Sequence, residues 1–259
     1  MKKNEMPNKQ IKSFKERCHG EKPLLGTLLS IPSPEVVEII SSLGFDWLFI
    51  DAEHGAMDVP DVQRILQAAG ETLTCLVRVP LNDEIWIKKV LDTGAHGIIV
   101  PQINSAHEAE LAVKFAKYPP MGSRSVGIAR AHGYGGIFQK YVEEANQNTV
   151  VIVQVELIEA VKNIDAIVKV KGVDGVFVGL FDLSASMGKP GEVNDPEVKA
   201  AIARIKKAAD RVKMPLGIFA ADTDSVKAYI KEGFILVCSA TDTLLLRRSA
   251  EEMLNRLRR

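Results

Sequence analysis

The chain has 259 residues, 46% of them hydrophobic and 25% charged, which is the balance of an ordinary globular protein and the length of one large domain. Lys plus Arg equals Asp plus Glu at 33 each, so no net charge favours binding to nucleic acid or to anionic lipid. The three cysteines cannot all pair, no apolar stretch reaches membrane-spanning length, and the opening "MKKNEMPNKQ" lacks a signal-peptide core, so we expect a soluble, cytoplasmic protein without a membrane partner.

Short apolar runs alternate with helical patterns along the chain, beginning with the run at 24–30. This run stops at Pro32, and Ser33 and Pro34 then supply an N-cap and a first-turn proline for a helix that ends before Gly44. The other apolar runs lie at 47–51, 74–79, 97–101, 150–156, 175–182, 215–220 and 235–240. Their helical patterns lie at 59–69, 82–94, 105–117, 156–170, 196–211, 224–233 and 243–259.

Near-continuous apolar strands that alternate with helices predict parallel strands covered on both faces. Eight such units in this length indicate an α/β fold with a closed (β/α)8 TIM barrel. A doubly wound open sheet is the rival, but it would carry a Gly-rich turn after the first strand, where this chain has "SIPSPE". We therefore expect a polar N-terminal tail with a short helix over residues 1–20, followed by one catalytic barrel domain over residues 21–259.

The segment 118–148 is longer than a normal connection between a strand and a helix. Long structured loops in compact domains often serve as lids or binding loops, so we expect this one to close over the substrate. His132, within "ARAHGYGG", is a candidate substrate contact in it, with an ordinary structural role as the alternative.

Polar side chains stand where the predicted strands end, which in a barrel is the face that carries catalysis. They are Asp51, Glu53 and His54, then Arg78, then Gln154 and Glu156, then Asp182 and finally Asp242, which we expect to be the N-cap of the last helix. Gln154 and Glu156 occupy alternate strand positions and so point to one face. Glu156 and Asp182, at the ends of neighbouring strands, suit a divalent cation such as Mg²⁺ or Mn²⁺, with ion pairing to Arg78 as the structural alternative.

The chemistry that the sequence lacks narrows the reaction class. No Lys lies inside a predicted strand, which disfavours a Schiff-base mechanism. The common zinc motifs and the P-loop motif are absent. The seventh and eighth strands end without a Gly-rich phosphate nest, so an unphosphorylated oxo acid is the more plausible substrate.

Four stretches carry a resemblance to a known family. In order they are "FIDAEHG", "VRVPLND", "VQVELIEAVKNID" and "GVDGVFVGLFDLSASMG". Over roughly residues 24–257 the chain resembles the HpcH/HpaI aldolase/citrate lyase family, and within it the metal-dependent (class II) pyruvate aldolases, such as those acting on 4-hydroxy-2-oxo-heptanedioate and on 2-keto-3-deoxy sugar acids. The resemblance implies an enzyme that cleaves or forms 4-hydroxy-2-oxo acids, with pyruvate and an aldehyde as products, through a metal-stabilised pyruvate enolate.

The resemblance also implies roles for residues near the strand ends. Glu156 and Asp182 match the metal ligands, for Mg²⁺ or Mn²⁺ with Co²⁺ and Zn²⁺ as further candidates. Gln154 matches a contact to the pyruvate moiety, and Arg78 matches the Arg that steadies the enolate oxygen. His54 matches the catalytic base. A second set of matches concerns the pyruvate carboxylate, which the backbone N–H of Phe181 together with Asp182 would hold.

Two positions fit the family pattern less well, one by its expected place in the fold and one by its residue type. Asp92 matches an acid that raises the basicity of the histidine, but it closes a helix and should lie at the opposite end of its own barrel. It could therefore act only through a neighbouring subunit or a displaced helix. Phe181 stands where the heptanedioate aldolases commonly have a small residue. Family members are typically hexamers, which implies a homo-oligomer here.

Two other functions remain open at this point. One is an acyl-CoA lyase of the citrate-lyase β-subunit type, although no basic cluster stands out to meet the CoA phosphates. The other is a non-catalytic barrel that binds a keto acid, which the set His54, Arg78, Glu156 and Asp182 disfavours.

Overall fold

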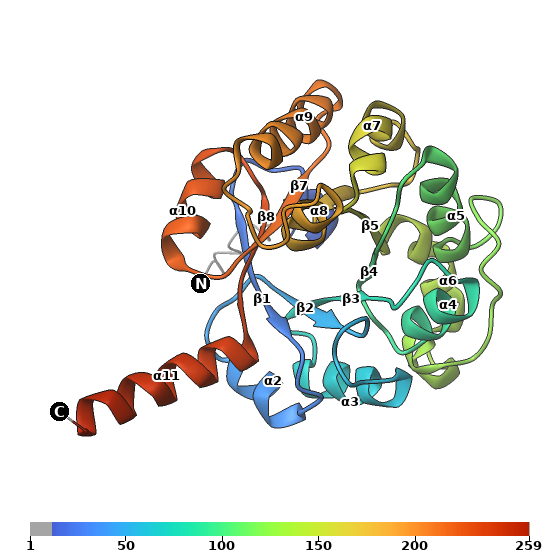
Figure 1. The fold of residues 1–259 in the computed structure, drawn as a ribbon. Helices are drawn as coiled ribbons and strands as arrows, with labels where there is room; N and C mark the ends of the chain where they lie inside the picture. Colours follow the sequence, from blue (N-terminus) through green and yellow to red (C-terminus); the bar gives the residue numbers. More distant parts are fainter. Residues whose placement is uncertain (1–11, 259) are drawn as a thin grey trace, which may run out of the picture.

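The computed structural model describes residues 12–258, and at its centre lies a closed barrel of eight parallel strands (Figure 1). Each strand pairs with its neighbour in sequence, and the last pairs with the first. The strands are β1 (Leu24–Leu29), β2 (Trp47–Asp51), β3 (Thr74–Arg78), β4 (Gly97–Val100), β5 (Val150–Val155), β6 (Gly175–Val178), β7 (Leu216–Ala220) and β8 (Leu236–Thr241). The predicted (β/α)8 barrel is confirmed.

Helices surround the barrel, and those with buried apolar faces pack against its strands. Those that follow a strand are α2 (Pro34–Ser41), α3 (Val59–Ala69), α4 (Glu84–Asp92), α5 (Ala106–Ala116), α7 (Ile158–Ile167), α8 (Leu180–Ser186), α9 (Pro196–Val212), α10 (Thr223–Lys231) and α11 (Asp242–Leu257). Three further elements are α1 (Phe14–Cys18), the 3-10 helix η1 (Arg130–Gly135) and α6 (Phe138–Asn148). The Ser33 hydroxyl accepts a hydrogen bond from the N–H of Val36, which confirms the predicted N-cap. Among the described helices, none is both long and apolar enough to cross a membrane.

Large aromatic rings fill the barrel interior because glycines on the neighbouring strands leave room for them. A Cβ added to Gly26 would lie 2.4 Å from the Trp47 indole, and one added to Gly217 would lie 2.4 Å from the Phe177 ring. Phe49 stacks on Phe177 with ring centroids 5.4 Å apart. This apolar layer supports the polar side chains above it, at the carboxyl ends of the strands.

The short helix α1 belongs to the barrel rather than to a separate tail. Phe14 and Cys18 are buried in the same cluster as the interior residues of the barrel, and the Phe14 ring centroid lies 6.4 Å from that of Trp47. The helix thus closes the amino end of the barrel with apolar side chains. Residues 1–11 of the predicted polar tail lie outside the described residues.

The long segment 118–148 lies at the amino end of the barrel. Arg130 donates hydrogen bonds to the carbonyls of Thr93 (2.7 Å) and Leu66 (3.3 Å), both of which precede strands rather than follow them. His132 is fully buried, and its Nε2 lies 3.0 Å from the Tyr118 hydroxyl. The expectation that this segment covers the substrate site of its own chain, with His132 as a contact, was therefore wrong.

The last helix, α11, extends away from the barrel rather than lying along it (Figure 1). Its sequence nevertheless contains apolar residues that are largely exposed. They are Leu245 (47%), Leu246 (66%), Met253 (62%), Leu254 (43%) and Leu257 (76%). An exposed apolar row of this size on a projecting helix is a feature of surfaces that contact another protein chain.

Candidate active site

A pocket of about 380 Å³ opens at the carboxyl ends of the strands. Five of the residues predicted from the sequence line it: His54, Arg78, Gln154, Phe181 and Asp182. The pocket also contains Ser30, Asp51 and Thr241, and apolar residues form the rest of its wall. The structure therefore brings together side chains that lie as far as 128 positions apart in the sequence, between residues 54 and 182.

Arg78 is held by two carboxylates, one at the end of the neighbouring strand β2 and one in the loop that follows it. Its Nε and Nη2 donate to the two oxygens of Asp51 at 2.9 and 2.7 Å, and its Nη1 lies 3.0 Å from Glu53. The guanidinium also lies 5.3 Å from the centroid of the Phe49 ring. Burial would lower the pKa of Arg78, but the hydrogen bonds and negative charges of its partners raise it, so the group stays cationic.

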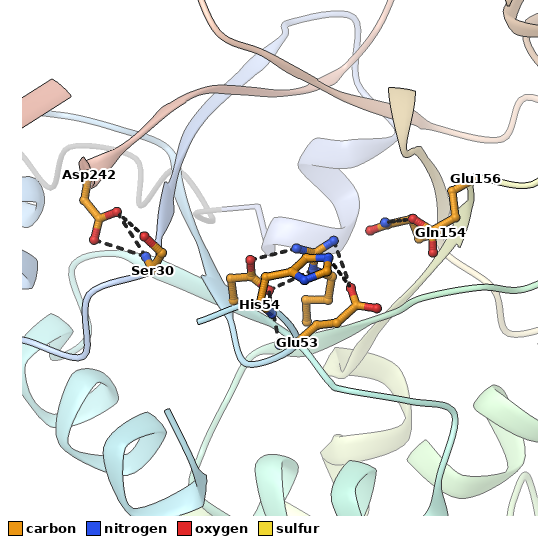
Figure 2. Close-up of polar contacts among 8 residues, drawn as sticks. Ser30, Glu53, His54, Gln154, Glu156 and Asp242 are labelled. Carbon is orange, nitrogen blue, oxygen red and sulfur yellow. Dashed lines mark hydrogen bonds and ion pairs between the residues drawn. The ribbon is translucent and has the colours of Figure 1, made fainter. Parts of the chain in front are cut away.

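His54 stands on the loop that Asp51 organises. The Asp51 Oδ1 accepts hydrogen bonds from the backbone N–H groups of Glu53 and His54, both at 3.2 Å. This turns the chain sharply after β2 and places the imidazole at the mouth of the pocket, where the side chain is 67% exposed. Its Nε2 lies 3.9 Å from Glu53 (Figure 2). The ring is therefore accessible to a substrate and can exchange a proton with it.

Glu156 follows β5 on the other side of the mouth, next to Gln154 (Figure 2). Its Oε1 accepts the backbone N–H of Gln102 at 2.7 Å, and its Oε2 accepts the side-chain amide of Gln154. The alternation predicted for Gln154 and Glu156 is confirmed by this contact. Burial raises the pKa of Glu156, the two hydrogen bonds lower it, and the nearby charge of Asp182 raises it further.

The sequence predicted Asp182 at the end of a strand, but the structure places it on helix α8. The strand β6 ends at Val178, and Gly179 then has φ −84° and ψ 89°, which leave the extended conformation and begin the helix. Leu180 and Phe181, which follow, are apolar and continue the strand pattern, so the sequence did not predict the change from strand to helix at Gly179. The glycine also permits close approach, since a Cβ there would lie 2.6 Å from the Glu156 Oε2.

The donor set near Glu156 fits a hard divalent cation. The charge of Asp182 is one of the causes that raise the pKa of Glu156. No ion pair between either carboxylate and Arg78 occurs in the described part of the chain, which disfavours the purely structural alternative. Among residues 12–258, no group of three or more His, Cys, Asp or Glu side chains is arranged to hold a metal. Glu156 and Asp182 would thus supply two oxygen ligands, and water and substrate oxygens the remainder, as is common for Mg²⁺.

Asp92 does not reach His54 within one chain. It ends α4, beside Thr93 at the amino end of the barrel, and its carboxylate accepts a hydrogen bond of 2.6 Å from the fully buried Arg124. Any action of Asp92 on a histidine base would have to cross to a second chain.

Asp242 closes the seam between the last strand and the first. Its carboxylate accepts hydrogen bonds from the backbone N–H and hydroxyl of Ser30 and from the N–H of Ile31, at 2.8 to 3.1 Å (Figure 2). The predicted N-cap role was wrong, because Thr241 caps α11 by accepting the N–H of Leu244 at 3.0 Å.

Two contributions to the site were not predicted from the sequence. Asp51 was expected at the end of its strand, but its ion pair with Arg78 was not; the two residues are paired in register across β2 and β3. That pairing could have been found by aligning the ends of the two predicted strands. Gln102 contributes only its backbone N–H, from a left-handed conformation with φ 56°, and no residue-type pattern signals such a role.

Comparison with known proteins gives a consistent result. Residues 26–249 match the model of a family described as HpcH/HpaI aldolase/citrate lyase. The chain is 41% identical over 245 residues to 4-hydroxy-2-oxo-heptane-1,7-dioate aldolase from Klebsiella pneumoniae, covering 93% of this chain and 92% of that protein. The enzyme of the same name from Escherichia coli is also 41% identical, with 93% of each covered. A solved structure of a family protein from Burkholderia cenocepacia superposes with a TM-score of 0.92 at 35% identity, covering 95% of this chain and 98% of that one.

Proposed function

The chain belongs to the HpcH/HpaI aldolase/citrate lyase family and is a carbon–carbon lyase of the aldolase type, and from this premise we propose that it converts 4-hydroxy-2-oxo acids to pyruvate and an aldehyde. The observation that carries the proposal is the pairing of two sets of groups across one pocket. Asp182 lines the pocket, and Glu156 is hydrogen-bonded to the lining residue Gln154, so the two carboxylates could offer oxygens to a divalent cation. The exposed imidazole of His54 lines the same pocket. A cation bound there would act as a Lewis acid toward the substrate oxygens.

The protein side chains divide the remaining work. His54 is placed to take the proton of the 4-hydroxyl group as the C3–C4 bond breaks, and the electrons of that bond then form the enolate of pyruvate. Arg78, which is fixed by Asp51 and Glu53, presents a positive charge to the developing enolate oxygen. Gln154 and the backbone N–H of Phe181 are proposed to orient the pyruvate part. Protonation of the enolate carbon completes the cleavage, and the reverse sequence is aldol addition.

Removal and restoration of the cation test this function. Protein treated with EDTA is expected to release no pyruvate from a 4-hydroxy-2-oxo acid, as followed with lactate dehydrogenase, and to recover when Mg²⁺, Mn²⁺ or Co²⁺ is added. Glu156→Gln is expected to lower kcat at least about 100-fold, because a ligand contributes more than the outer groups that orient it. Glu159→Gln, an exposed carboxylate on α7, is the control. Full turnover by Glu156→Gln in EDTA would sink the proposal.

We propose further that the active enzyme is a homo-oligomer, with the hexamer of its family as the first expectation. The exposed apolar side chains of the projecting α11 support this, because a second chain could cover them. The proposed action of Asp92 on His54 then becomes a contact between chains. Mixing inactive His54→Ala protein with inactive Asp92→Asn protein should regenerate sites that carry neither change, and activity that does not recover on mixing would count against it.

A further inference from the structure

The pocket is polar around the proposed oxo-acid site and apolar along one adjoining wall. Phe181 follows β6, Phe219 lies near the end of the neighbouring strand β7, and Leu28 lies on β1, beyond β8. The rings of Phe181 and Phe219 are tilted by 53° with centroids 6.4 Å apart. Phe181 is 54% exposed, which leaves a large aromatic face in contact with water at the mouth of the site.

The electrostatics of the pocket disfavour a second anionic group on the substrate. Asp51 and Asp182 line it, and two further carboxylates contact lining residues: Glu53 pairs with Arg78, and Glu156 accepts a hydrogen bond from Gln154. Among the described residues that line the pocket, the cationic or potentially cationic ones are Arg78 and His54. Arg78 already pairs with Asp51 and Glu53, and the proposed divalent cation would bind Glu156, Asp182 and the substrate's own carboxylate. Of the lining cations only His54 is then left, and as the proposed base it must be uncharged to accept a proton.

We propose that this chain selects aldehydes with an uncharged, apolar substituent, either alkyl or aryl, and that Phe181 and Phe219 are the residues that determine this selectivity. The inference rests on the proposed aldolase function and names its substrate class. It separates the chain from the relatives whose name gives a 1,7-dioate, and therefore a second carboxylate, as substrate. The physical reason is that an apolar substituent would cover the exposed rings, whereas a carboxylate would face the rings and like charges.

The test is a competition between two aldehydes in the addition direction, with Mn²⁺-loaded full-length protein and pyruvate. Hexanal and 4-oxobutanoate serve as the apolar and the anionic probe, and kcat/KM is measured for each. We expect hexanal to be preferred by at least about tenfold, the range over which an apolar pocket discriminates. Phe181→Ala and Phe219→Leu should each shrink this preference, and Val212→Ala, an exposed apolar residue at the end of α9, should leave it unchanged.

An independent measurement separates failure of the inference from failure of the function. Enolate formation exchanges the methyl protons of pyruvate with deuterium from the solvent, and this requires no aldehyde. If the wild-type protein shows no exchange with any divalent cation, the aldolase proposal and this inference both fall. If exchange occurs but 4-oxobutanoate is used as well as hexanal, or Phe181→Ala and Phe219→Leu leave the ratio unaltered, the selectivity inference alone is overturned.

Discussion

At the scale of single residues, the buried pair of Asp51 and Arg78 determines both the shape and the charge of the site. Asp51 binds the guanidinium with both oxygens and also accepts two backbone N–H groups of the following loop. One carboxylate therefore fixes the cation proposed for the enolate and the loop that carries the base. Loss of its charge should affect stability and catalysis together.

Asp51→Asn keeps the size of the side chain and removes its charge. We expect the free energy of unfolding to fall by about 2–4 kcal/mol, because a buried guanidinium loses a charged partner, and kcat to fall with it. Urea denaturation measures the first effect and pyruvate release the second. Asp165→Asn is the matched control, because Asp165 pairs with two arginines on the surface and should cost no more than about 1 kcal/mol. Equal stability losses in the two variants would contradict this account.

Lys117 provides a residue-scale prediction of pH dependence away from the active site. Its ammonium is buried and donates to the carbonyls of Asn146 (2.9 Å) and Thr149 (2.5 Å), and burial lowers its pKa to about 8. Between about pH 8 and the ordinary value of 10.5, the unfolded chain holds a proton that the folded chain has lost. The contribution of Lys117 to the free energy of unfolding must therefore rise with pH across this window.

The corresponding experiment compares Lys117→Met with the wild type by urea denaturation at pH 7 and pH 10. The difference between the two proteins is expected to change with pH in favour of the wild type, by roughly 1–3 kcal/mol. Lys114→Met, an exposed neighbour on α5, should show no such change. A constant difference between wild type and Lys117→Met at both pH values would mean that the ammonium is not desolvated.

At the scale of elements, the repeating strands and helices could be predicted from the sequence, whereas single departures from the repeat could not. Eight apolar strands and their helices follow from alternation and from caps such as Ser33, because burial on both faces leaves a periodic pattern. The start of α8 was not predictable in this way, since Leu180 and Phe181 suit a strand as well as a helix. The sequence predicted His54, Glu156 and Asp182 as site residues, and their roles stay predictions. It gave no sign of Gln102, because a backbone donor does not depend on residue type.

The turn from β6 into α8 allows a sharp test of the proposed metal site. Gly179→Ala would place a Cβ 2.6 Å from the Glu156 Oε2 and 3.1 Å from the Gln154 amide nitrogen, so the carboxylate must move. We expect the Kd for Mn²⁺, measured by titration calorimetry, to rise at least about tenfold. Gly127→Ala is the control, since a Cβ there meets nothing within 4 Å. Unchanged Mn²⁺ binding in Gly179→Ala would show that this carboxylate is not a ligand.

At the scale of the whole molecule, the barrel and the projecting helix have different requirements. The barrel buries its own core, whereas α11 exposes apolar side chains that no described residue of the same chain covers. Leu246→Lys combined with Met253→Lys is therefore expected to reduce the oligomer to a smaller species in light scattering. Glu252→Gln, an exposed polar change on the same helix, should leave the mass unaltered. An unchanged mass in the double variant would place the interface elsewhere.

The contact between Asp242 and Ser30, which joins β8 to β1, also bears on the order in which strands can pair during synthesis. The hydrogen bonds from Ser30 to Asp242 join residues 212 positions apart, so the first strand is synthesised long before its partner exists. Until β8 emerges from the ribosome, β1 has an open edge that can pair with another nascent chain. Because β8 is the last of the eight barrel strands, ring closure must wait until the other seven have been synthesised, and a chain that stops before β8 keeps that open edge.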